Sequence, residues 1–198
     1  MSPDPSHPTL EQHGGLETLL RETPVAYLGL VESLPSNGAA GRPYVVPVNF
    51  AYVGSSAALD QSRPSPTSGG APDAETQAPA EPADDRTCPR LFFHTGVGRK
   101  TLALAKNPHV CVAVTGDVSF SAGLRPCEDG FHYRSALVWG RARLLEGRED
   151  RLVALRAIVA KYDPQAVRRP FGEHDFAQTQ VYEVLVDTVS YKERPRPA

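Results

Sequence analysis

Residues 91–108 read LFFHTGVGRKTLALAKNP, and this stretch joins an apolar run, a glycine-containing bend and a mixed run that ends at a proline. The run LFFHT favours a β-strand because aromatic and apolar residues are frequent in strands. Gly96 and Gly98 let the backbone turn where a side chain would obstruct it. The residues from the bend to Pro108 favour a helix, which the proline stops. The stretch therefore predicts a strand, a tight bend and a helix in direct succession.

The start of this predicted helix has the features of an anion site. A helix N-terminus offers backbone N–H groups without helical partners and a partial positive charge. Arg99 adds a planar fork that fits phosphate oxygens, and Lys100 adds a mobile point charge. These features predict a phosphate site at the bend. The alternative is a solvated first helical turn that carries two basic residues.

The composition indicates one domain with a modest core. The chain has 198 residues, of which 40% are hydrophobic, and a net charge of −2. Because it lacks a long basic run, we expect no nucleic-acid partner. It has no apolar stretch near the length of a membrane span, and its N-terminus lacks the basic and apolar parts of a signal peptide. We therefore expect a cytoplasmic protein that does not act at a membrane.

The cysteines and histidines do not form a recognisable metal or disulfide pattern. The three cysteines, Cys88, Cys111 and Cys127, are odd in number and contain no CxxC spacing. None of the six histidines has another histidine three or four residues away, as a helical metal site would require. We expect no metal site.

Residues 55–89 differ from the rest of the chain. They hold six prolines and seven alanines, and six acidic residues against two basic ones. Such a segment buries too little apolar surface to offset its ordering entropy, which predicts a disordered insert. The expected organisation is a flexible N-terminus at 1–14, one domain at 15–192 interrupted by this insert, and a tail at 193–198.

Outside the insert, the pattern predicts a mainly β, α+β domain. Pro24 ends a helical spacing of leucines near the N-terminus, and Pro47 within a predicted strand implies an edge or a bulge. Mostly sequential strands with a few helices favour a small antiparallel barrel with helices packed outside. Strands are expected at 25–32, 44–53, 91–95, 109–115, 131–146 (bent at Gly140) and 180–191. Helices are expected at 98–107 and 148–162, the second with a core face of Leu152, Leu155, Val159 and Tyr162.

Three stretches occur in a definite order: PYVVPVNFAY (43–52), FFHTGVGRKTLALAKNP (92–108) and YRSALVWGRARLL (133–145). Their combination resembles the pyridoxamine 5′-phosphate oxidase-like flavoproteins, also called FMN-binding split barrels, and among these the nitroimidazole-resistance group. The resemblance covers residues 15–192 apart from the insert. It implies a six-stranded antiparallel split β-barrel with flanking helices, and a homodimer with FMN in a groove between the subunits.

The resemblance also implies which residues bind the cofactor. Arg99 and Lys100 match the basic pair on the FMN phosphate, and His94 and Thr95 match positions beside the ribityl chain and the ring. Ser135 falls where the oxidases carry a glutamine that reaches the flavin or its phosphate.

A second implied group is the strand that touches the flavin edge, matched here by Val46, Pro47, Val48, Asn49 and Phe50. An apolar strand with unpaired groups next to a proline suits a flavin wall. The alternative for Val46, Val48 and Phe50 is that they face the core.

Two departures argue against vitamin B6 oxidation. Val46 and Ala51 stand where the true oxidases carry an arginine and a lysine. The chain ends in SYKERPRPA and lacks the Arg-Leu segment that grips pyridoxal phosphate in those enzymes. We therefore do not expect a true pyridoxamine phosphate oxidase.

His94 is the candidate catalytic residue. A histidine beside a flavin can donate a proton to a reduced nitro group or quinone, because its ordinary pKa lies near neutrality. The alternative is a histidine that caps the strand and hydrogen-bonds a carbonyl. Tyr133 and Trp139 fit either a ring stacked on the flavin or, as propensity favours, the core.

Together these observations predict an FMN-dependent oxidoreductase that passes hydride or electrons between a small-molecule donor and an acceptor such as a nitroaromatic compound. The alternative from another class is a protein of the same fold that binds flavin or haem without turnover.

Overall fold

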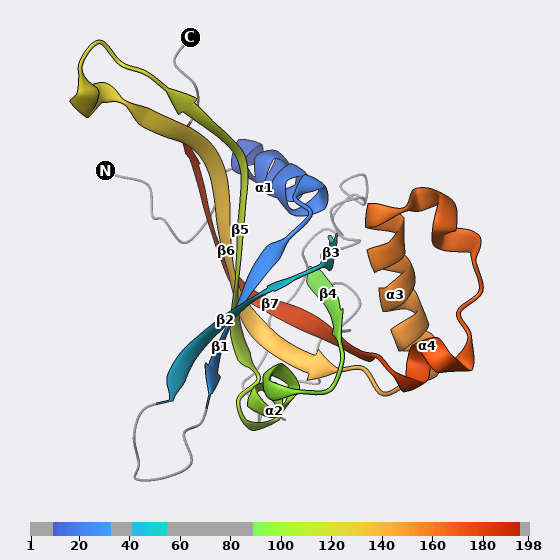
Figure 1. Cartoon of the computed structure of the whole chain (residues 1–198). Helices are drawn as coiled ribbons and strands as arrows, with labels where there is room; N and C mark the ends of the chain where they lie inside the picture. The colour runs from blue at the N-terminus through green and yellow to red at the C-terminus, as the bar shows by residue number, and fades with distance from the viewer. Residues whose placement is uncertain (1–9, 33–40, 55–88, 195–198) are drawn as a thin grey trace, which may run out of the picture.

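The computed structural model describes residues 10–32, 41–54 and 89–194 (Figure 1). The insert expected at 55–89 lies outside the described residues except for its last proline, and so does most of the expected N-terminal segment. Helix α1 (Leu10–Glu22) begins five residues before the expected domain boundary at residue 15.

Within the described residues, seven strands form one antiparallel sheet with helices around it, which confirms the predicted fold class. The strand order is β2-β1-β5-β6-β7-β4-β3. The strands are β1 (Ala26–Glu32), β2 (Arg42–Val48), β3 (Phe50–Val53), β4 (Arg90–Thr95), β5 (His109–Ser121), β6 (Gly130–Leu144) and β7 (Gln180–Arg194).

The sheet is open and has one strand more than the six we predicted, because the strand expected at 44–53 is divided at Asn49. Its first half, β2, pairs with β1 at one edge of the sheet, and its second half, β3, pairs with β4 at the other edge. The edge position of β2 confirms the prediction from Pro47, since proline cannot donate a hydrogen bond to a further strand.

The helices pack at separate places around the sheet. Figure 1 shows α3 (Arg148–Tyr162) and α4 (Glu173–Ala177) together on one side, and α2 (Arg99–Lys106) near one end. Helix α3 has the predicted bounds, and its predicted core face is confirmed in part: Leu155 is buried and Leu152 packs beside it, but the other buried residues are Ala154 and Ile158. Ala154 packs in one buried cluster with Ala51 of β3 and Phe92 of β4. No helix in the described ranges is long and apolar enough to cross a membrane.

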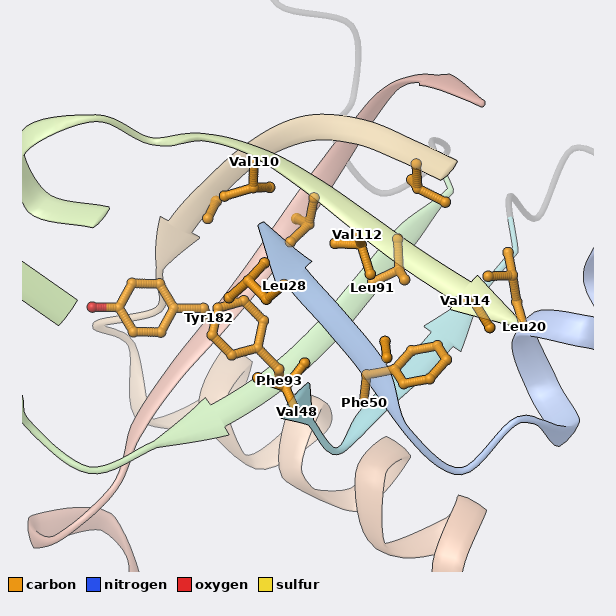
Figure 2. Close-up of a cluster of buried hydrophobic side chains, with 14 of the residues drawn as sticks. Leu20, Leu28, Val48, Phe50, Leu91, Phe93, Val110, Val112, Val114 and Tyr182 are labelled. Carbon is orange, nitrogen blue, oxygen red and sulfur yellow. The ribbon is translucent and has the colours of Figure 1, made fainter. Parts of the chain in front are cut away.

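Strand β4 is covered on both faces, which explains its continuous apolar run. Leu91 and Phe93 lie in the main core, where Phe93 stacks on Tyr182 with ring centroids 5.2 Å apart (Figure 2). Phe92 points the other way and joins a second cluster with Leu155 of α3 and residues of β3 and β7. A strand buried on both faces reads as an unbroken apolar stretch rather than an alternating one.

The other side of β2, β1, β5 and β6 carries exposed apolar side chains. Residues on these strands alternate between the core and this outer face, and the strand register places Trp139 opposite Cys111. Trp139 is 39% exposed, so its predicted core position is wrong. We call this surface the outer face; its exposed members are Tyr27, Val31, Val45, Leu137 and Trp139.

Gly140 occupies a position in β6 that has no room for a side chain. The register between β6 and β7 shifts between Trp139 and Gly140, where the bend was predicted. A Cβ added at Gly140 would lie 2.1 Å from the Leu185 carbonyl oxygen. We expect Gly140→Ala to lower the free energy of unfolding by about 1–3 kcal/mol, the usual cost of overpacking, measured by urea denaturation.

The control is the same substitution at an open helical site. A Cβ at Gly14 of α1 meets no atom within 4 Å, so Gly14→Ala should raise stability by roughly 0.5–1 kcal/mol. An unchanged unfolding midpoint for Gly140→Ala would show that β7 can shift to accommodate the methyl group.

Candidate functional site

The bend between β4 and α2 has the predicted structure. Strand β4 ends at Thr95, and α2 begins at Arg99 with Gly98 as its N-cap. The Thr101 hydroxyl fastens this start: it donates to the Gly98 carbonyl at 2.8 Å and accepts from the Gly98 N–H at 3.1 Å. The start of the helix is therefore held by contacts within its own first turn.

Gly96 and Gly98 are not required by the fold of this chain. A Cβ built at either residue meets no atom within 4 Å, and neither residue has a left-handed φ. The expectation that a side chain would obstruct the turn is therefore wrong. Instead, the two glycines leave open space beside the helix start.

Arg99 already binds an anionic group, the carboxylate of Glu32 at the end of β1. Its Nε and Nη2 donate to the two carboxylate oxygens, with Nη2 at 2.7 Å from Oε2. Arg42 donates to the same oxygen at 3.0 Å through its own Nη2. The two guanidinium groups, Arg99 foremost, lower the pKa of Glu32 to about 2. We call Arg42, Glu32 and Arg99 the Glu32 triad.

The ring of Tyr44 packs against one face of the Arg99 guanidinium. The guanidinium carbon lies 4.6 Å from the ring centroid, a cation–π contact. Arg99 is therefore fixed by a carboxylate at its edge and by an aromatic ring at its face.

Lys100 and His94 form the second part of the site. Burial lowers the pKa of Lys100, and within the described residues its ammonium has neither an ion pair nor a hydrogen bond. Partial desolvation, and then the charge of Lys100, lowers the pKa of His94, which favours the neutral imidazole at neutral pH. The capping alternative for His94 gains no support, because its side chain makes no hydrogen bond to another described residue.

The predicted flavin-edge strand divides between the core and the surface. Val48 and Phe50 are buried, and Val46 packs against the main core, as the alternative interpretation held. Pro47 and Asn49 are exposed.

The backbone of Phe50 is already engaged by α3. Its N–H donates to the Tyr162 hydroxyl at 2.9 Å, and that hydroxyl donates to the Pro24 carbonyl at 2.6 Å. Arg99 lies at the opposite end of β2, where it contacts Tyr44 and shares the Glu32 carboxylate with Arg42.

Ser135 lies far from the bend within one chain. It pairs with Thr115 in β5, six positions beyond His109, where β5 begins after α2. Six strand residues span about 20 Å. On the other side of β6, Ser135 pairs with Lys192 of β7. A single chain therefore does not bring Ser135 to Arg99.

An open surface pocket also lies away from the bend. Its volume is about 390 Å³, and its lining includes Asp117, His132, Arg134 and Arg194. It lies where the β5–β6 register shifts, beside an Asp117 with a φ of 54°. No group of three or more metal-binding side chains occurs in the ranges that the structure describes.

Sequence reasoning missed Glu32, Arg42 and Tyr44. Glu32 and Arg42 are Cα partners at the end of the pair where β1 ends and β2 begins. A sequence signal existed, since an acidic and a basic residue flank the stretch between the strands expected at 25–32 and 44–53. The contact of this pair with Arg99 had no such signal.

Comparison with solved structures identifies the fold. A candidate 5-nitroimidazole antibiotic resistance protein from Bacteroides thetaiotaomicron shares 19% identity with a TM-score of 0.63, over 92% of this chain and 84% of that one. The flavocytochrome Anf3 from Azotobacter vinelandii also shares 19% identity with a TM-score of 0.63, over 98% and 71%. The FAD and heme binding protein from Mycobacterium smegmatis shares 21% identity with a TM-score of 0.66, over 98% and 77%.

No curated protein matches the sequence. A family model described as pyridoxamine 5′-phosphate oxidase matches residues 82–193, which include β4, the bend, α2 and the long strands β5 to β7. This match covers more than half of the chain and contains Arg99, Lys100 and His94. The chain belongs to the pyridoxamine 5′-phosphate oxidase family.

Proposed function

We propose that this chain is an FMN-dependent oxidoreductase that holds the cofactor by its phosphate at the start of α2. The observation that carries the proposal is the bound Glu32 carboxylate, because it places anionic oxygens on Arg99 at a helix N-terminus. Lys100 adds a second cation without an ion-pair partner among the described residues, and the glycines leave open space there. This donor set fits a phosphate.

The chain's own residues have separate tasks in this proposal. Arg99, Lys100 and the first N–H groups of α2 bind and orient the phosphate, and Thr101 keeps the helix start in place. When bound, FMN supplies hydride or electron transfer between a small-molecule donor and acceptor. His94 is the proton donor to the reduced acceptor in this proposal, and because its pKa is lowered we expect it to act in that role below neutral pH.

For the acceptor we propose a nitroaromatic compound. The support is the fold shared with the candidate nitroimidazole resistance protein, together with Val46 and Ala51 at the positions where B6 oxidases carry basic residues. Bleaching of the bound flavin by NAD(P)H, followed by reoxidation with a nitroaromatic compound, tests this part of the proposal.

A second candidate is a haem-binding protein, supported by two relatives whose descriptions name a flavocytochrome and a haem protein. His94 is exposed and its lowered pKa keeps the imidazole neutral, the form that ligates haem iron. The absorption spectrum of the purified protein separates the two: flavin bands support FMN, and a Soret band supports haem.

We also propose that the protein acts as a homodimer through the outer face. Tyr27 is 52% exposed and Val45 is 60% exposed, and a contiguous apolar surface of this kind marks an interaction site. Ser135 occupies the same face as Leu137 and Trp139. Since Ser135 does not reach Arg99 within one chain, its role at a cofactor requires the second subunit.

The phosphate assignment predicts the behaviour of a double variant. Arg99→Ala with Lys100→Ala should weaken FMN binding by roughly 100-fold, because two charge-assisted hydrogen-bond donors are lost. Affinity for riboflavin, which lacks the phosphate, should not change. Quenching of flavin fluorescence measures both constants.

The control is Arg168→Ala with Arg169→Ala, an adjacent pair of exposed basic residues elsewhere in the chain. This pair should bind FMN as the unaltered protein does. Equal FMN affinity in the Arg99, Lys100 variant would refute the phosphate assignment.

The electrostatics of His94 give a second prediction. Lys100→Gln should raise the pKa of His94, because loss of a neighbouring positive charge makes imidazolium easier to form. Burial still acts, so the pKa should remain below its ordinary value. NMR titration of the His94 ring measures it, with Lys106→Gln at the far end of α2 as the control. If the pKa of His94 does not change in Lys100→Gln, the two side chains do not lie close enough to interact.

The dimer proposal predicts that a charge on the outer face dissociates the subunits. Trp139→Glu should convert the dimer to a monomer in sedimentation velocity, because the carboxylate would be buried without a partner. Val153→Glu on α3, where the valine is 57% exposed, should remain dimeric. If Trp139→Glu sediments as the unaltered protein does, the subunits do not meet at this face.

A further inference from the structure

Glu32 lies where an anionic ligand of α2 would lie. Its side chain is 15% exposed, and it comes from the last residue of β1 rather than from α2 or a neighbouring turn. Both of its oxygens accept from Arg99, and one also accepts from Arg42. The carboxylate therefore fills the anion position at the helix start with a group of the protein itself.

The contact uses an edge of the Arg99 guanidinium that can bind two phosphate oxygens at once. A guanidinium binds two anionic oxygens at once through parallel N–H donors, and Nε with Nη2 forms one such edge. Glu32 occupies this edge. The face of the guanidinium is covered by Tyr44. A phosphate that binds Arg99 through this edge must therefore displace Glu32 from it.

The contact is also weak enough to be displaced. The side chains of Arg99 and Arg42 are 52% and 58% exposed, and solvent screens ion pairs between such groups. A phosphate ester dianion carries about twice the charge of a carboxylate and has three acceptor oxygens. Lys100 has no ion pair in the described part of the chain, and Glu32 does not bind it. Lys100 can therefore add a contact to a phosphate that the Glu32 carboxylate does not receive.

We propose that Glu32 is an intramolecular stand-in for the phosphate: it holds Arg99 when no phosphate is bound, and a dianionic phosphate ester displaces it. This inference rests on the proposed function, because it assigns a competitor to the same phosphate site. Its consequence is selectivity. A dianion displaces the carboxylate, whereas a carboxylate ligand or a flavin without phosphate gains little over the contact it would replace.

The test is Glu32→Gln, which keeps the size of the side chain and removes the competing charge. FMN should bind up to about fivefold more tightly, because the phosphate no longer has to displace an exposed ion pair. Riboflavin affinity should not change. Acetate, as a monoanionic probe, should compete with FMN in Glu32→Gln and not in the unaltered protein.

Glu173→Gln is the matched control, since Glu173 forms an exposed ion pair with Arg148 between α3 and α4. It should leave both flavin affinities unchanged. If Glu32→Gln instead weakens FMN binding, Glu32 is a positioning residue that aims Arg99 at the ligand, and the stand-in inference is overturned. Unchanged FMN affinity also overturns it.

A measurement on the unaltered protein separates this inference from the proposed function. Titration with inorganic phosphate should shift the Arg99 Nε–H resonance as Glu32 is replaced, and Glu32→Gln should saturate at lower phosphate concentration. If this occurs while FMN does not bind, the FMN proposal fails and the stand-in inference holds. If FMN binds but phosphate leaves the Arg99 resonance unmoved, the stand-in inference fails alone.

Discussion

Leu91 and Phe93 point from β4 into the main core, while Phe92 between them packs against α3. Burying such side chains stabilises the fold by roughly 1.5–3 kcal/mol each, so β4 is fixed from both sides. The rest of the structure depends on this constraint. It sets where the strand ends, and thereby where Thr95 gives way to the bend and where α2 begins. A strand held on one face alone would leave the start of α2 free to move.

Electrostatics then complete the site that β4 positions. A cation at a helix N-terminus opposes the helix dipole, so Arg99 is stabilised by a nearby anion. In this structure Glu32 supplies that anion from β1, and Arg42 shares it. The same requirement explains why a phosphate suits the position: it offers more charge and more oxygens to the same donors. Anion recognition at this site is thus a consequence of the fold before any ligand is considered.

Much of the fold follows from local pattern. The bounds of α3, the strand–bend–helix succession and the edge position of Pro47 were all predicted, because periodicity, breakers and the missing proline N–H act within a few residues. The division of 44–53 into two edge strands was not predicted. The buried face of α3 was predicted only in part, because the strands it packs on decide that Ala154 and Ile158 are covered. The outward position of Trp139 was not predicted for the same reason. Alternating side chains define two faces of a strand, but they do not indicate which face another element covers.

The sequence by itself determined that an apolar strand leads through two glycines to a helix that starts with Arg99 and Lys100. These are short-range features, because the interactions that produce them act between residues close in sequence. Only the tertiary structure decided that Arg99 meets Glu32, 67 positions earlier in the chain, and that Ser135 is remote from both within the chain. Charges distant in sequence pair only where the sheet register brings them together. That register is set by the packing of the whole sheet, and no local pattern encodes it.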